Sequence, residues 1–262
     1  IDIHLTIADP ALSFEIDIAE ESGVRTLHFG SNWIQGAMRI ARPFALELDY
    51  TREMMAGLML RPEPAWPKQV LLIGLGAGSL TKFLRRHRSS ARLTVVEIEP
   101  RVVAAARQFF RLPDEDERLR IVIGEGADFV AGSRGTFDLI LVDGFDENAR
   151  TGELDSARFY LNCRARLSDD GLLAANLLSK RRDFRDSVAR IAEAFDGRAL
   201  AFPSCDSGNA IAFAATGAAV DHTLFDLRAA ARTLKRDTGL NLLPTLARLE
   251  GSHHCAGGCL VI

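Results

Sequence analysis

Four acidic residues follow apolar, strand-like segments in the middle of the chain. They are Glu97, Glu125, Asp143 and Asp146. In a parallel sheet the carboxyl ends of the strands meet at one edge, so we expect these side chains to line one crevice. Carboxylates there can accept hydrogen bonds from ribose hydroxyls or an adenine amine, and they can take a proton from a reacting amine. The pattern therefore predicts a site for an adenosyl nucleoside beside a nitrogen nucleophile.

A glycine-rich turn, Gly74 to Ser79, follows the first apolar segment. Its glycines permit a tight turn and let backbone N–H groups approach a ligand at the start of the next helix. Glu97 ends the second segment, where it can hold both ribose hydroxyls. We predict that the nucleoside is bound by Gly74, Gly76, Gly78 and Glu97. A dinucleotide fingerprint requires glycine where this chain has Ser79, so NAD is the second choice of ligand.

The acids after the third and fourth segments have different predicted roles. Glu125 stands between two glycines and is placed to bind an adenine amine, whereas Asp128 can cap the next helix. Asp143 and Asp146 flank the expected ligand. Near a sulfonium cation, such carboxylates can orient an amine, accept its proton and free it to attack a carbon bonded to sulfur. We predict that Asp143 is catalytic, while a capping role for Asp146 stays open.

Apolar runs alternate with helical stretches through the central region. The expected strands are Gln69 to Ile73, Arg92 to Ile98, Leu119 to Ile123, Phe137 to Val142 and Gly171 to Asn176. The intervening helices predict a parallel sheet covered on both faces. Residues 199–203 and 210–215 are joined too closely for a crossover helix and should pair antiparallel. The predicted fold is α/β, with a Rossmann-like sheet of the class I S-adenosylmethionine methyltransferase type that ends in an antiparallel hairpin.

The first part of the chain has a different pattern. Apolar and polar residues alternate in 13–18 and 25–30, which predicts small antiparallel strands, and a helical stretch follows over 50–60. Three prolines among residues 61–67 mark a junction. We therefore predict two domains. They are an N-terminal β-strand domain with a linking helix, residues 1–60, and a nucleoside-binding catalytic domain with a helical C-terminal part, residues 61–262.

Composition limits the partners and the compartment. Lys and Arg number 32 against 35 Asp and Glu, so no field of one sign favours nucleic acid. No apolar run approaches the ~20 residues of a membrane span, and the chain does not start with a secretory pattern. The four cysteines do not form a disulfide framework, so we expect a cytoplasmic protein. The segment from His253 to Cys259 holds possible metal ligands, but we expect a loose tail and no metal.

The order of these motifs resembles the spermidine synthase family, the polyamine aminopropyltransferases, over roughly residues 25–215. The segment Leu27 to Gly30, followed by Gln35, is similar to the family's Leu-Asp-Gly segment and its downstream glutamine. The segment Glu53 to Ala56 is similar to the helix that bears Tyr-His-Glu-Met, with Tyr50 one residue before the family's tyrosine. The resemblance implies a homodimer formed through the N-terminal strands.

The resemblance also implies a reaction. In this family an aminopropyl group moves from decarboxylated S-adenosylmethionine to a polyamine or related amine, and methylthioadenosine is released. The family's ribose-binding, adenine-binding and amine-activating acids map to Glu97, Glu125 and Asp143. Its polyamine-holding acid, in an Asp-Ser-Ser-Asp-Pro segment, maps to Asp146. Gln35 and Tyr50 complete the implied substrate site.

Two departures from the family pattern leave alternatives open. Ala77 stands where the family's glycine loop has an acid that neutralises the aminopropyl ammonium, a charge-assisted bond worth about 1.5–3 kcal/mol. Its loss makes intact S-adenosylmethionine more acceptable, so an S-adenosylmethionine-dependent methyltransferase is the first alternative. Gly144 and Phe145 separate the two acids where the family has hydroxyls. A non-catalytic nucleoside-binding homologue is the second alternative.

Overall fold

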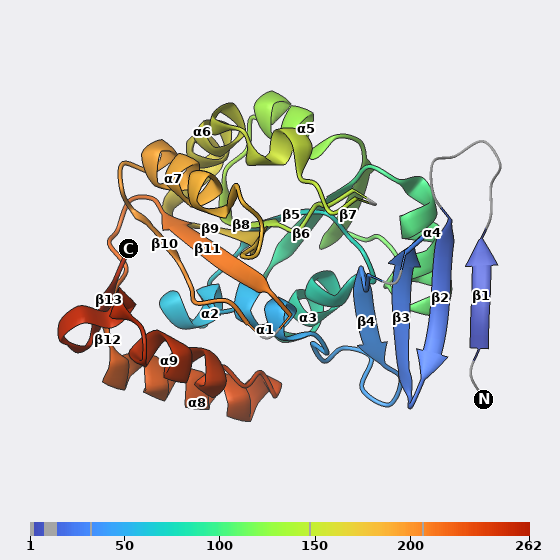
Figure 1. The fold of residues 1–262 in the computed structure, drawn as a ribbon, viewed down its shortest axis with the longest axis horizontal. Coiled ribbons are helices and arrows are strands. Elements are labelled where there is room, and N and C mark those ends of the chain that lie inside the picture. The colour runs from blue at the N-terminus through green and yellow to red at the C-terminus, as the bar shows by residue number, and fades with distance from the viewer. Residues whose placement is uncertain (1–2, 8–14, 32, 147, 206) are drawn as a thin grey trace.

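The computed structural model describes residues 3–7, 15–31, 33–146, 148–205 and 207–262. Its core is a seven-stranded sheet in the order β10-β11-β9-β8-β5-β6-β7. A four-stranded sheet, in the order β1-β2-β3-β4, lies beside it, and the C-terminal strands β12 and β13 form a small third sheet (Figure 1). The predicted α/β fold class is confirmed.

The N-terminal sheet is antiparallel throughout, as predicted. Its strands are β1 (Ile3–Ile7), β2 (Ile16–Glu21), β3 (Val24–Phe29) and β4 (Gly36–Arg39). The strand alternation buries Ile16 and Ile18 on β2 together with Leu27 on β3, which gives this sheet one apolar face. Residues 13 and 14 of the predicted strand lie outside the described residues.

Five neighbouring parallel strands form most of the central sheet. They are β5 (Gln69–Ile73), β6 (Arg92–Glu97), β7 (Leu119–Ile123), β8 (Phe137–Val142) and β9 (Leu167–Leu178). For β5, β7 and β8 the predicted bounds match the observed ones. The fifth strand is longer than predicted because Leu167 already pairs with Phe137, before a register shift at Leu139.

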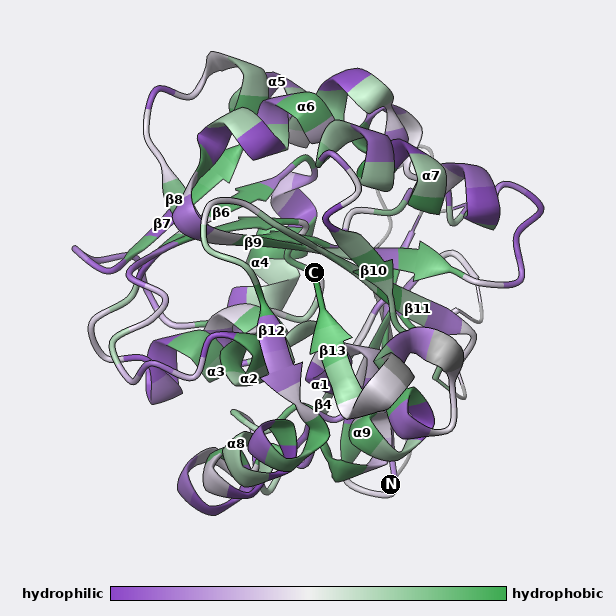
Figure 2. Cartoon of the chain, turned by 90° about the vertical axis from the view of Figure 1, so that its left-hand side faces the viewer, coloured by the Kyte–Doolittle hydropathy of each residue, from purple (hydrophilic) through white to green (hydrophobic). Residues whose placement is uncertain are grey.

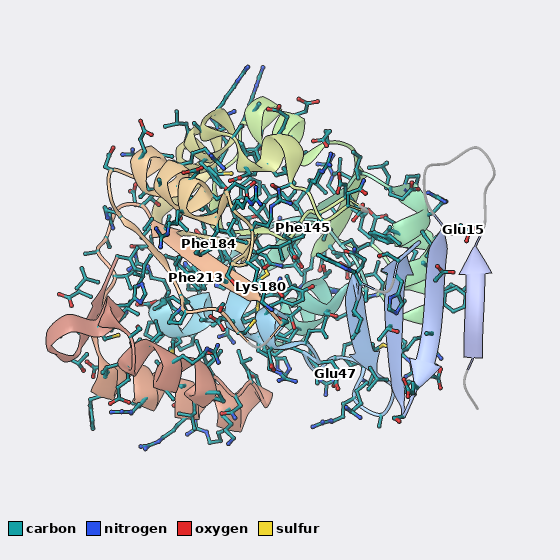
Figure 3. The ribbon with its side chains drawn as sticks, viewed as in Figure 1. Glu15, Glu47, Phe145, Lys180, Phe184 and Phe213 are labelled. Atoms are coloured by element: carbon teal, nitrogen blue, oxygen red, sulfur yellow. The ribbon has the colours of Figure 1, made fainter. Side chains whose placement is uncertain are left out.

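The predicted hairpin is confirmed, and it ends the sheet. Its strands are β10 (Ala199–Ala201) and β11 (Asn209–Ala215), and β11 runs antiparallel to both β9 and β10. Phe213 on β11 is fully buried (Figure 3), and its ring centroid lies 4.7 Å from that of Phe202. This aromatic contact stabilises the antiparallel edge of the sheet, which β10 and β11 form.

Helices cover both faces of the central sheet, and its strands are mostly apolar between them (Figure 2). Alternate residues of β5 face opposite ways: Val70 and Leu72 join the core on one side, Leu71 and Ile73 the core on the other. The first core includes residues of α3 (Ser79–His87), α4 (Pro100–Phe109) and α8 (Leu224–Thr238). The second includes residues of α5 (Gly126–Gly132), α6 (Ala157–Arg166) and α7 (Phe184–Ala194). Among the described residues, no helix is long and apolar enough to cross a membrane.

The helical stretch predicted for residues 50–60 is two short helices, α1 (Asp49–Met54) and α2 (Gly57–Leu60). The first ends in a tight turn, because the Met55 and Ala56 N–H groups bond three residues back. Helix α1 packs against β9 and β11, and α2 packs against α8. The domain boundary at residue 60 stays a prediction.

The C-terminal segment contradicts the prediction of a loose tail. It contains α9 (Leu243–Glu250), the 3₁₀ turn His253–Gly258 and β13 (Cys259–Val261), which pairs with β12 (Asp221–Thr223). Leu260 and Ile262 are buried, and Ile262 exchanges backbone hydrogen bonds with Val220. The apolar area that these side chains remove from water holds the tail in place.

Candidate active site

A pocket of about 850 Å³ lies at the carboxyl ends of β5 and β8. The chain's strand order reverses between these neighbours, which is where open α/β sheets form their binding crevice. Eight of the nine predicted site residues line it: Gln35, Tyr50, Gly74, Gly76, Glu97, Glu125, Asp143 and Asp146. The ninth, Gly78, is not among the described lining residues. Segments from the N-terminal sheet through β9 therefore converge on one cavity.

Gly74 makes room for the backbone of Asp143. Its φ is +90°, and a Cβ on it would lie 2.2 Å from the Asp143 carbonyl oxygen. The Asp143 N–H in turn donates to the Ile73 carbonyl at 2.8 Å. Gly78 is left-handed at the start of α3, and a Cβ there would meet Leu112 at 2.9 Å. These glycines are required by the close approach of chain segments as well as by any ligand.

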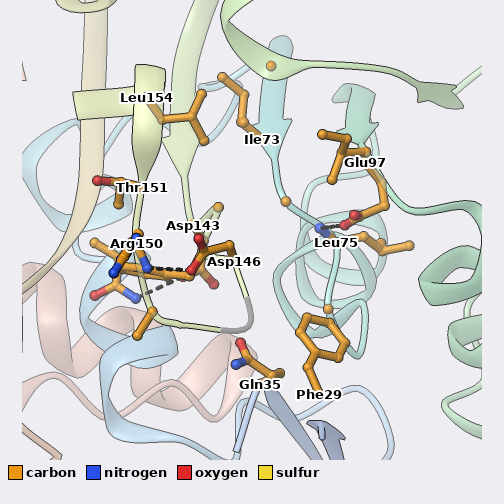
Figure 4. A pocket seen from close by; sticks show the side chains of 18 of the residues that line it. Phe29, Gln35, Ile73, Leu75, Glu97, Asp143, Asp146, Arg150, Thr151 and Leu154 are labelled. Carbon is orange, nitrogen blue, oxygen red and sulfur yellow. Dashed lines mark hydrogen bonds between the residues drawn. The ribbon is translucent and has the colours of Figure 1, made fainter. Parts of the chain in front are cut away.

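Backbone N–H groups hold the carboxylate of Glu97. The Leu75 N–H donates to Oε2 at 2.8 Å, and the Glu99 N–H donates to Oε1 at 3.0 Å. Burial raises the pKa of Glu97, and these two bonds oppose the rise. The neighbouring Glu99 instead caps α4 and pairs with Arg101. Glu97 is thus fixed at the pocket wall with lone pairs left for hydroxyl donors (Figure 4).

Glu125 projects from the turn between β7 and α5. It occupies the N-cap position of α5 but makes no side-chain capping bond, and its side chain is exposed at the pocket. Asp128 lies in the first turn of α5, where the helix dipole favours an acid. Phe29, Trp33 and Ile98 add apolar surface to the same pocket. This combination suits a flat, partly polar ring.

Asn176 holds the carboxylate of Asp143, and Tyr50 lies beside it. Asn176 Nδ2 donates to Oδ1 at 2.8 Å, and the Tyr50 hydroxyl is close enough to interact with the carboxylate. Burial raises the pKa of Asp143, whereas Asn176 and Tyr50 lower it. Burial and the Asp143 charge raise the pKa of Tyr50, so its hydroxyl remains a donor. A carboxylate with a raised pKa, held by neutral donors, is suited to accept a proton.

Asp146 serves its own loop. Its Oδ1 accepts hydrogen bonds from the N–H groups of Asn148 and Arg150, both at 2.8 Å. The Arg150 carbonyl accepts from the Asp146 N–H at 2.9 Å. Figure 4 shows Asp143, Asp146 and Arg150 on the side of the pocket opposite Glu97. Asp146 therefore stabilises a turn in its own loop and does not cap a helix, because the next helical turn has Thr151 at its N-cap position. The residue also lines the pocket.

Comparison with known proteins identifies the family. A family model described as the spermine/spermidine synthase domain matches residues 48–200. The chain is 34% identical over 239 residues to a polyamine aminopropyltransferase of Neisseria meningitidis serogroup B, covering 91% of this chain and 90% of that protein. The chain belongs to the spermine/spermidine synthase family. It is a transferase, as its motifs predict.

One more curated relative and two solved structures are similar to this chain. A polyamine aminopropyltransferase of Chromobacterium violaceum is 35% identical over 249 residues, covering 95% of this chain and 94% of that protein. A probable spermidine synthase from Corynebacterium glutamicum aligns with a TM-score of 0.73 at 19% identity, over 89% of this chain and 87% of that chain. The structure of human methyltransferase-like protein 13 in complex with SAH aligns with a TM-score of 0.66 at 23% identity. The alignment covers 74% of this chain and 93% of that chain. These two structures show the shared fold alone.

The largest departure from the family's motifs, Ala77, is explained by the N-terminal sheet. Ala77 is 2% exposed, and a Cβ on Gly36 of β4 would lie 2.6 Å from the Ala77 Cβ. The neighbouring Gly76 is close to the residue before β4, because a Cβ there would lie 2.9 Å from the Gln35 carbonyl oxygen. Ser79 Oγ donates to the Ala37 carbonyl at 3.1 Å. The N-terminal sheet therefore fixes the shape of the glycine loop, and Ala77 faces that sheet.

Sequence motifs missed two polar residues beside Asp143. Asn176 is 4% exposed near the end of the apolar strand β9, and Asn209 begins β11. Both line the pocket. An asparagine in a buried strand was the available signal, because a buried amide requires partners. Glu47 was also missed; it lines the pocket from the segment that joins the N-terminal sheet to α1 (Figure 3).

Charge in the pocket is mainly negative. The ionisable residues that line it are Glu47, Asp49, Tyr50, Glu97, Glu125, Asp143, Asp146, Arg150 and Glu153. Glu47 pairs with Arg39, and Asp49 pairs with Arg52. Within the described residues, no group of three or more His, Cys, Asp or Glu side chains could hold a metal ion. An excess of carboxylates favours cationic ligands.

Proposed function

We propose that this protein transfers an aminopropyl group from decarboxylated S-adenosylmethionine to a polyamine or related small amine, releasing methylthioadenosine. The relatives named polyamine aminopropyltransferase, aligned over more than 90% of the chain, support this activity. One observation carries the proposal: the carboxylate of Asp143, held by Asn176, lies across the pocket from Glu97, which the glycine loop holds. A base and a ribose-binding acid thus share one cavity.

The donor occupies the glycine-loop side in this proposal. Glu97 accepts hydrogen bonds from the ribose hydroxyls, and Glu125 accepts one from the adenine amine. Gly74 and Gly76 give the nucleoside access to the loop backbone, while Gly78 shapes the turn into α3. The apolar lining residues and the exposed Glu125 carboxylate support this orientation, because adenine has an apolar face and a polar edge.

The reaction then follows from the acceptor side. The ionised Asp143 accepts a proton from the substrate ammonium, which leaves a nitrogen lone pair. That lone pair forms a bond to the methylene carbon beside the sulfonium, and the breaking C–S bond returns its electrons to sulfur as a neutral thioether. Asn176 holds the Asp143 carboxylate, while Asp146 and Gln35 bind the rest of the amine. Positioning of the two reactants supplies most of the rate enhancement.

We further propose a cytoplasmic homodimer. The N-terminal sheet has strands β1 and β4 at its edges, and a second copy would cover an edge that otherwise exposes backbone groups. The four cysteines are free thiols, which suits a reducing compartment. No metal takes part in the proposed reaction. Sedimentation of the purified protein tests the oligomeric state.

The decisive test is a product assay. Purified protein is incubated with putrescine or a longer polyamine and with either decarboxylated or intact S-adenosylmethionine, and products are identified by mass spectrometry. We expect methylthioadenosine and an aminopropylated amine only with the decarboxylated donor, and loss of both in Asp143→Asn. Asp128→Asn, at an exposed acid outside the pocket lining, is the matched control. Methylated product from the intact donor would overturn the proposal in favour of a methyltransferase.

A further inference from the structure

A chain of side-chain hydrogen bonds connects Asp143 to the turn between β10 and β11. Asn176 Nδ2 donates to Asp143 Oδ1 at 2.8 Å, and Asn209 Nδ2 donates to Asn176 Oδ1 at 2.9 Å. Ser207 Oγ then donates to Asn209 Oδ1 at 2.7 Å. Cys205 Sγ lies 3.0 Å from Ser207 Oγ at the far end. Asn176, Asn209 and the exposed Ser207 therefore link this turn to the acid in the pocket, and the buried Cys205 contacts the last of them.

The strand pairing explains why these residues meet. Asn176 on β9 is opposite Ile211 on β11, and Asn209 is opposite Leu178. The two asparagines are thus diagonal neighbours two residues apart, which places their side chains on the same face of the antiparallel pair. Strand β9 also pairs with β8, whose end delivers Asp143. The register of β8, β9 and β11 therefore places the side chains of the hydrogen-bonded series next to one another.

The donor and acceptor groups of the chain have one consistent direction. An ionised carboxylate only accepts hydrogen bonds, so Asn176 must present its NH₂ to Asp143 and its oxygen to Asn209. Asn209 must then donate to Asn176, and its own oxygen is left to accept the single proton of Ser207. Every dipole points its positive end toward Asp143. Aligned hydrogen bonds of this kind strengthen one another.

We propose that Asn176 and Asn209 are positioning residues that hold Asp143 ionised and aim its free lone pairs at the amine. This inference rests on the proposed function for the role of Asp143. Asn176 is 4% exposed, so its amide depends on protein partners to select its orientation. Without the Asn209 donor, the Asn176 oxygen has no partner on that side, and the amide is free to turn its oxygen toward Asp143. That orientation favours the protonated acid.

Other ionisable groups lie around Asp143. Tyr50 on α1 is beside its carboxylate and lowers its pKa, and Cys205 in the β10–β11 turn interacts electrostatically with Tyr50. Asp146 and Arg150 lie on the loop that follows Asp143, in the same pocket. A substitution of the Asn209 side chain leaves Tyr50, Asp146 and Arg150 in place, and Cys205 keeps its bond to the Asn209 backbone carbonyl, so a change in the titration of Asp143 in such a variant reports on the chain of amides.

The test compares Asn209→Leu and Ser207→Ala with the wild-type protein. Asn162→Leu, a part-buried asparagine on α6 outside the pocket lining, is the matched control. Two measurements are made. The first is the pH dependence of aminopropyl transfer, and the second is a ¹³C NMR titration of aspartate carboxyl groups, with Asp143 assigned from the Asp143→Asn spectrum. The NMR titration needs no turnover, so its outcome is independent of the proposed reaction.

We expect Asn209→Leu to raise the pH at which Asp143 titrates by about one unit, which lowers kcat about tenfold on the acid limb and less at higher pH. Ser207→Ala should move the titration less and in the same direction. Methylthioadenosine affinity should stay within about twofold, because Glu97 binds on the opposite side. An unchanged Asp143 titration in Asn209→Leu would overturn the inference. So would a rate loss of equal size at every pH, which would indicate only a structural role.

Discussion

The two sides of the pocket hold their acids in different ways. On the donor side, backbone N–H groups of Leu75 and Glu99 hold the carboxylate of Glu97. On the acceptor side, the side chain of Asn176 holds Asp143, and the Tyr50 hydroxyl lies beside it. Backbone donors are present whatever the side chain, so the donor side tolerates local substitution. The acceptor side depends on particular side chains from distant segments, and we expect it to be the more sensitive half.

The largest expected effect is that of Asp143→Asn. This change keeps the size of the side chain but removes the proton acceptor, so kcat should fall by about 10²–10⁴. Methylthioadenosine binding, measured by calorimetry, should change little because the donor side is intact. Loss of nucleoside binding in this variant would contradict the division of the pocket into two sides.

Part of this two-sided arrangement of the pocket can be predicted from the sequence. The glycine turn and Glu97 are separated by one strand and one helix, so local periodicity is enough to place them. Tyr50 and Asn209 reach the acceptor side through α1 and through the β9–β11 register, which depend on contacts between distant segments. The C-terminal strand β13 was missed for the same reason, since its pairing with β12 closes a long loop. Local patterns therefore predict the donor side better than the acceptor side.

The two sides of the pocket can also be compared by their effect on the free energy of unfolding, because the helix on each side carries one buried ionisable group. Glu53 on α1, paired with Arg248, has its pKa raised to about 7 by burial. Lys82 on α3, whose Nζ donates to the Phe110 carbonyl, has its pKa lowered to about 7 by burial. Both shifts favour the neutral form. The helix of each side thus carries a group whose charge is disfavoured in the folded protein.

These groups should affect the free energy of unfolding with opposite pH dependence. Between pH 4.5 and 7 the unfolded Glu53 is ionised while the folded one keeps its proton, so its contribution falls as pH rises, by on the order of 3 kcal/mol. Between pH 7 and 10.5 the unfolded Lys82 is charged while the folded one is neutral, so stability rises with pH. The free energy of unfolding is measured in urea as a function of pH. Glu53→Gln should abolish the fall between pH 4.5 and 7, and Lys82→Met should abolish the rise between pH 7 and 10.5. If both slopes persist, these two residues are not their source.

Glu97→Ala tests the donor side directly. Removing a charged acceptor for two hydroxyls should weaken methylthioadenosine binding by about thirtyfold, or about 2 kcal/mol. Glu117→Ala, an exposed acid outside the pocket, is the control. Calorimetric titration measures both variants. Equal affinities in the wild-type protein and Glu97→Ala would show that the ribose is bound elsewhere.

The smallest expected effect is that of Tyr50→Phe, and it separates positioning from packing. The variant keeps the ring but loses the hydroxyl that lies beside Asp143 and interacts with it. This interaction is weaker than a close hydrogen bond to a charged group and is worth about 1 kcal/mol, so kcat should fall about fivefold and the acid limb of the pH profile should move to higher pH. Tyr160→Phe is the matched control, because its hydroxyl donates to Asp155 at 2.9 Å away from the main pocket lining. Tyr160→Phe should lower the free energy of unfolding and leave the pH profile unchanged. If Tyr50→Phe also leaves the wild-type pH profile unchanged, Tyr50 contributes only packing.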